Sequence, residues 1–275
     1  MKVGYHIYLE RDPYNTIKDT VEKYGTNVGT ILVWDMSLYN QDTVNEIKRA
    51  CKDFNFEVDA IWCGWSGVTK WGYPEMYQTV GLVPEETRAQ RVEDILQGAR
   101  FANDLGVKMI VTHPGYIPDN PFDKTHIETV DAFRHICHEI KQYGQRLAFE
   151  TGELLPVTLV QIIEEIGEGN VGINFDPSNF TTGGRANAAT AMNLLAPWVL
   201  GMHGKDGVYP TGTSPKGKQV RVVGTGDVDF PSIIKTLKEN GFDGVIAIEH
   251  ETASDDRDQD IRDSKAYLES LIESV

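Results

Sequence analysis

The chain has 275 residues, of which 40% are hydrophobic, so it can bury a substantial core. Its formal net charge of -15 disfavours binding to the phosphate backbone of nucleic acids. No apolar run approaches the roughly 20 residues of a membrane span, and the N-terminus lacks a signal-peptide pattern. The three cysteines, Cys51, Cys63 and Cys137, form no CxxC pair, which favours reduced thiols. We therefore expect a cytoplasmic protein that binds neither nucleic acid nor a membrane.

Short apolar runs alternate with helical patterns along the whole chain. The clearest helical patterns cover residues 85–106 and 126–144, and no Pro/Ser-rich linker divides the sequence. The apolar runs are rich in β-branched residues, as is typical of strands buried on both faces. They cover residues 3–9, 28–34, 57–63, 107–113, 146–150, 171–176, 198–203 and 244–249. Eight units of about 34 residues each predict an α/β fold, a single (β/α)₈ TIM barrel spanning residues 1–275.

The last four apolar runs end in residues that can bind a metal ion. These residues are Glu150, Asp176, His203 and Glu249. In a parallel barrel the carboxyl ends of the strands share one rim, where three carboxylates would repel one another without a cation. We therefore expect one divalent ion, with Mn²⁺ preferred and Mg²⁺, Co²⁺ or Zn²⁺ as alternatives. The alternative is that each residue merely caps a strand or a helix N-terminus.

Three further polar residues follow predicted strands. His113 ends the fourth run and either contacts a substrate hydroxyl or is a structural histidine. Lys205 either neutralises a developing oxyanion or is solvated. Asp206 is expected to act behind the metal ligands, orienting one of them or binding a loop amide.

Aromatic residues and one arginine complete the expected rim. Trp34, Trp62 and Trp65 follow the second and third runs, where their rings could bind the C–H faces of a sugar or plug the barrel. We expect Trp34 and Trp65 to contact substrate. Arg221 lies in the enlarged loop 207–227 and either binds a substrate carboxylate or phosphate or is a surface arginine.

Five segments of the chain resemble the xylose isomerase-like TIM barrel family, which includes sugar phosphate isomerases, sugar epimerases and inosose dehydratase. They are 147-LAFETGE-153, 173-INFDPSN-179, 202-MHGKDG-207, 222-VVGTGDVDFP-231 and 241-GFDGVIAIEHE-251. The resemblance implies that Glu150, Asp176, His203 and Glu249 hold the metal, and that the two glutamates are also the acid/base catalysts. Asn179 stands where epimerases of the family often carry a histidine. An asparagine can hydrogen-bond a substrate hydroxyl but cannot transfer its proton.

The sequence therefore predicts a metal-dependent isomerase or epimerase that acts on a small keto-sugar, sugar phosphate or polyol through an enediolate intermediate. A dehydratase or lyase acting on an inosose or keto-sugar uses the same intermediate and is the main alternative. An endonuclease IV-like nuclease shares the barrel, but it needs additional metal-binding histidines and a basic groove. The substrate, the choice of reaction and a homo-oligomeric state stay open at this stage.

Overall fold

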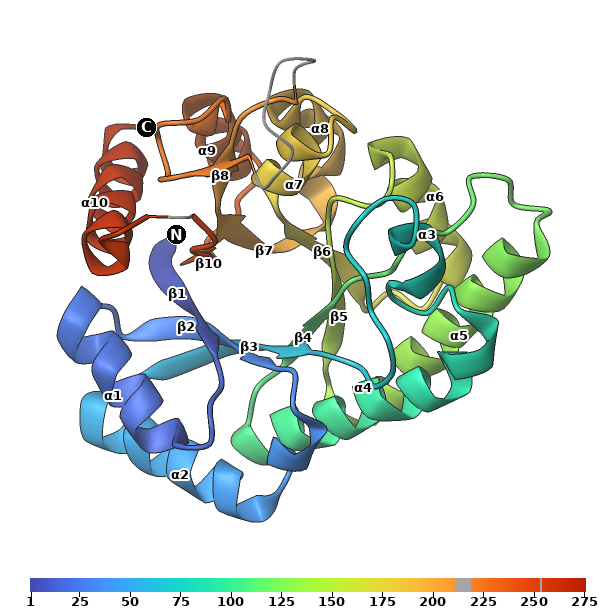
Figure 1. Cartoon of the computed structure of the whole chain (residues 1–275), viewed down its shortest axis with the longest axis horizontal. Helices are drawn as coiled ribbons and strands as arrows, with labels where there is room; N and C mark the ends of the chain where they lie inside the picture. The colour runs from blue at the N-terminus through green and yellow to red at the C-terminus, as the bar shows by residue number, and fades with distance from the viewer. Residues whose placement is uncertain (211–218, 253) are drawn as a thin grey trace.

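The computed structural model describes residues 1–210, 219–252 and 254–275, and its central feature is a closed barrel of eight parallel strands (Figure 1). The strands follow one another around the barrel in the order β1-β10-β7-β6-β5-β4-β3-β2. Their bounds are β1 Lys2–Tyr8, β2 Val28–Val33, β3 Glu57–Cys63, β4 Met109–Thr112, β5 Arg146–Glu150, β6 Val171–Phe175, β7 Val199–Gly204 and β10 Val245–Ile248. The predicted (β/α)₈ TIM barrel is confirmed.

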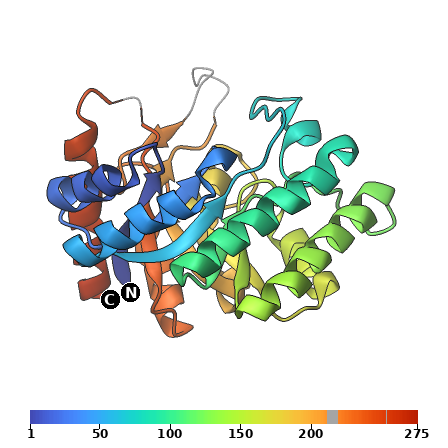
Figure 2. The same cartoon turned by 90° about the horizontal axis from the view of Figure 1, so that it is seen from below.

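Helices surround the barrel on its outside (Figures 1 and 2). The long ones are α1 Pro13–Tyr24, α2 Gln41–Phe54, α4 Glu85–Leu105, α5 Lys124–Ile140, α6 Pro156–Ile166, α8 Ala188–Leu195, α9 Phe230–Glu239 and α10 Arg257–Ser274. Shorter helical pieces are α3 Met76–Thr79, α7 Pro177–Thr182, η1 Met36–Leu38, η2 Lys141–Tyr143 and η3 Ala196–Trp198. The two helices expected from the sequence at 85–106 and 126–144 correspond to α4 and to α5 with η2.

Side chains alternate between the two faces of each strand, and this alternation places the candidate residues inside the barrel. On β5, Ala148 is buried in the small apolar cluster that fills the barrel, together with Ala60, Met109 and Val111. Glu150 is two residues further along the strand and therefore points to the same interior. Because Glu150 is the last residue of β5, its carboxylate lies at the mouth of the barrel rather than in its floor.

The predicted strands were placed to within two residues at each end, and two of the candidate ligands lie just beyond a strand. Asp176 follows β6 and is the N-cap of α7, where its side chain accepts a hydrogen bond from the backbone N–H of Asn179. Glu249 follows β10 directly. Both residues remain at the rim, because one extra residue does not carry the chain away from the strand end.

Two connections at the carboxyl ends of the strands are long. The connection from β3 to α4 rises above the barrel and contains α3 (Figure 2). The expected loop 207–227 contains part of a two-stranded antiparallel sheet, β8 Asp206–Gly207 paired with β9 Val220–Arg221, and its residues 211–218 lie outside the described residues. Within the described part of the chain, no helix combines the length and the apolar character that crossing a membrane requires.

Candidate metal centre and active site

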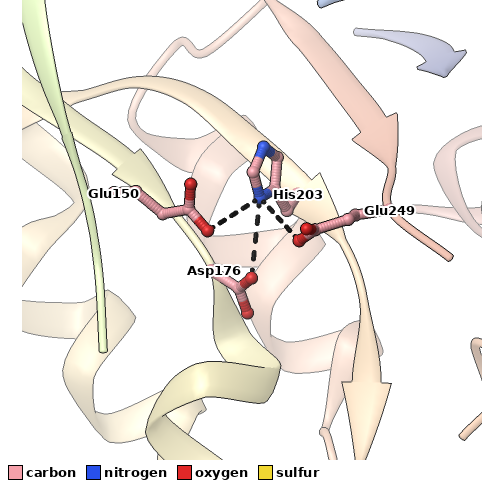
Figure 3. A group of neighbouring side chains, drawn as sticks. All are labelled: Glu150, Asp176, His203 and Glu249. Carbon is pink, nitrogen blue, oxygen red and sulfur yellow. Dashed lines mark ion pairs between the residues drawn. The ribbon is translucent and has the colours of Figure 1, made fainter. Parts of the chain in front are cut away.

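Four side chains from neighbouring strand ends converge on a single point (Figure 3). The Nδ1 atom of His203 lies 3.3 Å from Glu150 Oε1, 3.3 Å from Glu249 Oε2 and 3.5 Å from Asp176 Oδ2. One ligand atom from each residue lies within 4.8 Å of all the others, and all four residues are buried. The cluster matches the four ligands expected from the sequence.

The donor atoms of this cluster fit a divalent cation. Both ring nitrogens of His203 and Oδ2 of Asp176 are buried and have no hydrogen-bond partner among the described residues. Buried polar atoms are almost always satisfied, so the unpaired Nδ1 of His203 and Oδ2 of Asp176, which face one another, indicate a site for an ion. Three carboxylates and one imidazole form the oxygen-rich set that Mn²⁺ and Mg²⁺ accept.

Without a cation, His203 holds a proton and the glutamates of the cluster are ionised. Burial opposes the charged form of His203, but the carboxylates of Glu150, Asp176 and Glu249 outweigh burial and hold its pKa well above the ordinary value. Burial also opposes ionisation of Glu150, yet His113 and His203 lower its pKa to about 2. A cation bound here would replace the proton on His203, because the imidazole must be neutral to act as a ligand.

Hydrogen bonds hold the two glutamates in place. The indole N–H of Trp62 donates to Glu150 Oε2, and the side-chain amide of Asn179 donates to Glu150 Oε1 at 3.3 Å. The hydroxyl of Tyr8 donates to Glu249 Oε1 at 3.1 Å. Such outer contacts fix the direction in which each carboxylate presents its remaining lone pairs.

Lys205 is buried and ion-paired, so the solvated alternative does not apply. Its ammonium lies 2.8 Å from Glu249 Oε2, 2.8 Å from Glu251 Oε2 and 3.5 Å from Asp176 Oδ2. Burial disfavours the ammonium, but the carboxylates of Glu249, Asp176 and Glu251 raise the pKa of Lys205 well above its ordinary value. Lys205 therefore keeps a positive charge beside the clustered carboxylates.

His113 forms a buried pair with Glu153 at the same rim. Its Nδ1 lies 2.5 Å from Glu153 Oε1, and its Nε2 lies 3.6 Å from Glu150 Oε1. Burial lowers the pKa of His113, but Glu153 and Glu150 outweigh that effect and raise the pKa to about 9. Because Glu153 is engaged by His113, Glu150 is the glutamate of this segment that joins the metal cluster.

A cavity of about 770 Å³ opens above the cluster. Of the four clustered residues, Glu150 and Glu249 line this cavity, whereas Asp176 and His203 lie deeper. Its largely apolar side is formed by Tyr8, Leu32, Trp34, Trp62, Trp71, Met76 and Tyr116. Its polar side includes His113, Glu153, Asn179, Arg185, Lys205 and Glu251. A molecule with apolar faces and several hydroxyl groups suits such a lining.

The other residues named from the sequence fall into two groups. Trp34 lines the cavity and is 40% exposed, while Trp65 is buried behind it and donates its indole N–H to Thr69. Arg221 is exposed on β9, donates to the carbonyl of Val220 and is not among the described cavity-lining residues. The structure thus brings Trp34 to the cavity and leaves Trp65 and Arg221 outside its lining.

Asp206 takes the second of its two expected roles. Its carboxylate accepts hydrogen bonds from the backbone N–H groups of Gly207, Gly224, Gly226 and Val228. Among the described residues, no hydrogen bond or ion pair joins Asp206 to one of the four clustered residues. Asp206 therefore ties the segment after β9 to the end of β7 and positions that side of the rim.

Several cavity residues were not singled out from the sequence. Tyr8, Trp71, Glu251 and Arg185 line the cavity. Tyr8 and Glu251 lie within three residues of predicted strand ends, so a wider window around those ends would have found them. Trp71 and Arg185 come from long connections, and no local pattern marks them.

The described geometry agrees with the family comparison: the chain belongs to the xylose isomerase-like TIM barrel family, whose model matches residues 19–271. An uncharacterised protein of Methanocaldococcus jannaschii is 27% identical over 203 residues, covering 70% of this chain and 67% of that protein. A xylose isomerase domain protein from Planctomyces limnophilus has a similar structure with a TM-score of 0.91, 25% identity and coverage of 99% of this chain and 98% of that one. A D-tagatose 3-epimerase-like protein gives a TM-score of 0.74 at 22% identity, with coverage of 100% and 98%.

Proposed function

We propose that this protein is an enzyme, a divalent-metal-dependent isomerase or epimerase that acts on a small keto-sugar, sugar phosphate or related polyol. The observation that carries the proposal is that Glu150 and Glu249 belong to two sites at once. Each belongs to the buried cluster of four ligand residues, and each also lines the cavity above it. Two carboxylates that reach one cavity from the ends of β5 and β10, with β6 and β7 between them, can take a proton from one side of a substrate and return one from the other.

Glu150, Asp176, His203 and Glu249 would hold the metal ion. When bound, a divalent cation polarises a substrate carbonyl and the neighbouring hydroxyl, which makes the adjacent C–H bond more acidic. Mn²⁺ is the preferred ion for this donor set, with Mg²⁺, Co²⁺ and Zn²⁺ as alternatives.

Three side chains of the protein would carry out the proton transfers and stabilise the developing charge. Glu249, held by Tyr8 and Lys205, accepts the proton from the substrate carbon and leaves an enediolate. The ammonium of Lys205 offsets the negative charge that develops on oxygen. Glu150, held by Trp62 and Asn179, then delivers a proton drawn from solvent to the opposite face for epimerisation or to the adjacent carbon for isomerisation, and Glu249 releases its own proton to solvent.

Contacts along the cavity would orient the substrate. The ring of Trp34 offers an apolar face to the C–H groups of a sugar. His113 and Asn179 face the same cavity and can hydrogen-bond hydroxyl groups. These contacts place the carbon next to the glutamates without taking part in proton transfer.

A dehydratase is the second candidate, and His113 is the observation that favours it. Its imidazole faces the cavity, and the carboxylate of Glu153, 2.5 Å from Nδ1, favours the protonated form. An imidazolium can donate a proton to a leaving β-hydroxyl, so that the same enediolate loses water instead of regaining a proton. A nuclease is disfavoured, because the net charge of -15 and the carboxylates of the cavity oppose the approach of a phosphate backbone.

The test is hydrogen exchange at carbon. The full chain loaded with Mn²⁺, and in parallel with Mg²⁺, Co²⁺ or Zn²⁺, is incubated in D₂O with a panel of ketoses, ketose phosphates and inososes, and C–H exchange is followed by proton NMR. We expect exchange at the carbon next to the carbonyl of at least one substrate and none after chelation. Water loss in place of exchange would select the dehydratase, and no reaction with any of the four metals would overturn the proposal.

A further inference from the structure

Among the described residues, the charged side chains that line the cavity are paired, with one exception. Glu153 pairs with His113, and Glu249 and Glu251 both pair with Lys205. Arg185 also lines the cavity, but it forms no ion pair with any residue that the structure describes. An unpaired guanidinium is notable in a chain with a net charge of -15, where carboxylates are abundant.

Aromatic rings hold this guanidinium in position. Its central carbon lies 5.7 Å from the ring centroid of Tyr77 and 5.4 Å from that of Tyr116. One guanidinium nitrogen donates to the hydroxyl of Tyr77 at 2.8 Å. The other guanidinium N–H groups have no partner among the described residues. The two nearby rings and the hydrogen bond to Tyr77 restrain the guanidinium and leave its remaining donors available for a planar or tetrahedral anion.

Arg185 reaches the cavity from the segment after α7 and is not one of the four clustered residues. Arg185 follows α7, and its backbone N–H is bound by the carbonyl of Phe180. Together with Tyr116 and Glu153 it also borders a second cavity of about 650 Å³ beside the start of α4. The main cavity of about 770 Å³ therefore extends from the glutamates to a wall that carries an unpaired cation.

We propose that Arg185 binds an anionic group of the substrate, a carboxylate or a phosphate, at the end remote from the reacting carbons. The inference rests on the proposed function and makes its substrate an acidic or phosphorylated keto-sugar rather than a neutral one. Neutral sugars would leave the guanidinium facing the cavity without a counter-ion. An anion would supply two hydrogen-bond acceptors and the missing charge.

Binding of unreactive polyols tests this inference separately from catalysis. Calorimetric titration of the Mn²⁺-loaded full chain compares glucitol, glucitol 6-phosphate and gluconate, which differ chiefly in the anionic group. We expect the phosphate or the carboxylate ligand to bind about 10- to 100-fold more tightly than glucitol, and the preferred one identifies the group. Arg185→Ala should abolish this preference while leaving the affinity for glucitol nearly unchanged, and Arg185→Lys should keep part of it.

Arg49 provides a matched control. Its guanidinium also stacks on a tyrosine, 4.1 Å from the ring centroid of Tyr14, but it lies on α2 and pairs with Glu46. Arg49→Ala should keep the full preference for the anion. The inference is overturned if the wild type does not prefer either anionic ligand over glucitol, or if Arg185→Ala keeps the preference. A protein that shows the preference but no C–H exchange would overturn the proposed function and leave the role of Arg185 intact.

Discussion

Glu249 combines three contacts on one carboxylate. Its Oε2 faces His203 and Lys205, and its Oε1 accepts a hydrogen bond from Tyr8. Burial opposes its ionisation, but Lys205 and His203 hold the pKa of Glu249 well below the ordinary value. The carboxylate is therefore ionised at neutral pH, which both a metal ligand and a proton acceptor require.

We predict that Glu249→Gln lowers turnover by at least about 10²-fold, because glutamine keeps one ligating oxygen but has no useful basicity. Metal affinity should also fall, while the fold persists. The measurement is the C–H exchange rate at saturating metal, together with metal content by elemental analysis. Glu251→Gln is the comparison, since Glu251 contacts Lys205 but is not part of the metal cluster. If Glu251→Gln is the more damaging change to both rate and metal content, the assignment of Glu249 is incorrect.

For individual residues, the sequence predicted the site residues at the ends of strands. It missed those that reach the cavity from long connecting segments. Glu150, Asp176, His203 and Glu249 can be found from local patterns, because an apolar run that ends in a polar residue marks its own boundary. Arg185 cannot be found in this way. It contacts Tyr77, 108 positions earlier in the chain, and nothing in the surrounding TTGGR predicts which loop lies opposite.

The connection between β3 and α4 forms one wall of the cavity, and a buried arginine holds it. Arg91 on α4 is 1% exposed. Its guanidinium donates to the carbonyls of Ser66, Val68, Thr79 and Gly81, at distances from 2.6 to 3.2 Å. Burial lowers the pKa of Arg91 to about 10, so the group remains charged at neutral pH. The side chain of Arg91 thus holds together the connection in which Trp71 and Met76 line the cavity.

We predict that Arg91→Lys destabilises the protein by about 2–4 kcal/mol, because one ammonium cannot reach four carbonyls that the planar guanidinium satisfies. Amide hydrogen exchange in residues 64–82 should accelerate more than elsewhere. Urea denaturation and exchange mass spectrometry measure the two effects. Arg100→Lys is the control on the same helix, where Arg100 is exposed and pairs with Glu93, and its change should stay within about 0.5 kcal/mol. Equal effects of the two variants would contradict the role of Arg91.

A histidine at the start of α5 links that helix to α6. His126 is buried, with Nδ1 2.6 Å from the carbonyl of Pro118 and Nε2 2.6 Å from Glu165 Oε2. Burial opposes protonation of His126, but these two acceptors outweigh it and raise its pKa. Burial also opposes the charged form of Glu165 and so raises its pKa. The hydrogen bonds from Gln161 and His126 outweigh burial, and the net shift of the Glu165 pKa is downward.

The two shifts define a window of pH in which this link stabilises the fold. The contribution of His126 is present below its unfolded pKa and is lost as the pH rises through its raised folded pKa. The contribution of Glu165 is present above its unfolded pKa and is lost as the pH falls through its lowered folded pKa. We predict that His126→Gln costs most stability at about pH 5 to 6 and progressively less toward pH 9. Denaturant titrations across this range measure the difference, and a cost that grows with pH would contradict the assignment.

The elements themselves were largely predictable, and the exceptions have a physical reason. The strands β3 and β5 match their expected ranges, because apolar runs bounded by polar residues define strands that are buried on both faces. The strands β8 and β9 were not predicted. Each has two residues, and their pairing joins Asp206 to Arg221 across a loop rather than through any periodic pattern.

The stability of the whole molecule should depend on the metal. Without a cation, the barrel holds three carboxylates that are buried within one small cluster. An ion present at about 100 times its dissociation constant adds about 2.7 kcal/mol, which corresponds to roughly 5–10 °C in the melting temperature. We expect this shift between EDTA-treated and Mn²⁺-loaded protein in thermal scans, and a smaller one for Glu249→Gln. A melting temperature that none of the four candidate ions changes would argue against the metal site.

The cluster of tryptophans gives the molecule an optical reporter of its own. Four of the five tryptophans gather at the mouth of the barrel: Trp34, Trp62 and Trp65 have ring centroids 5.2 to 5.9 Å apart, and Trp71 lies 6.5 Å from Trp65. Trp62 donates to the candidate ligand Glu150, and Trp71 lies beside His113. The fifth, Trp198, ends η3, before the first residue of β7 and thus at the opposite end of the barrel. The intrinsic tryptophan fluorescence of the chain therefore arises mainly from the mouth of the barrel. Trp198→Phe would confine the tryptophan emission to this region, so that the binding of ions and sugars could be titrated without a label.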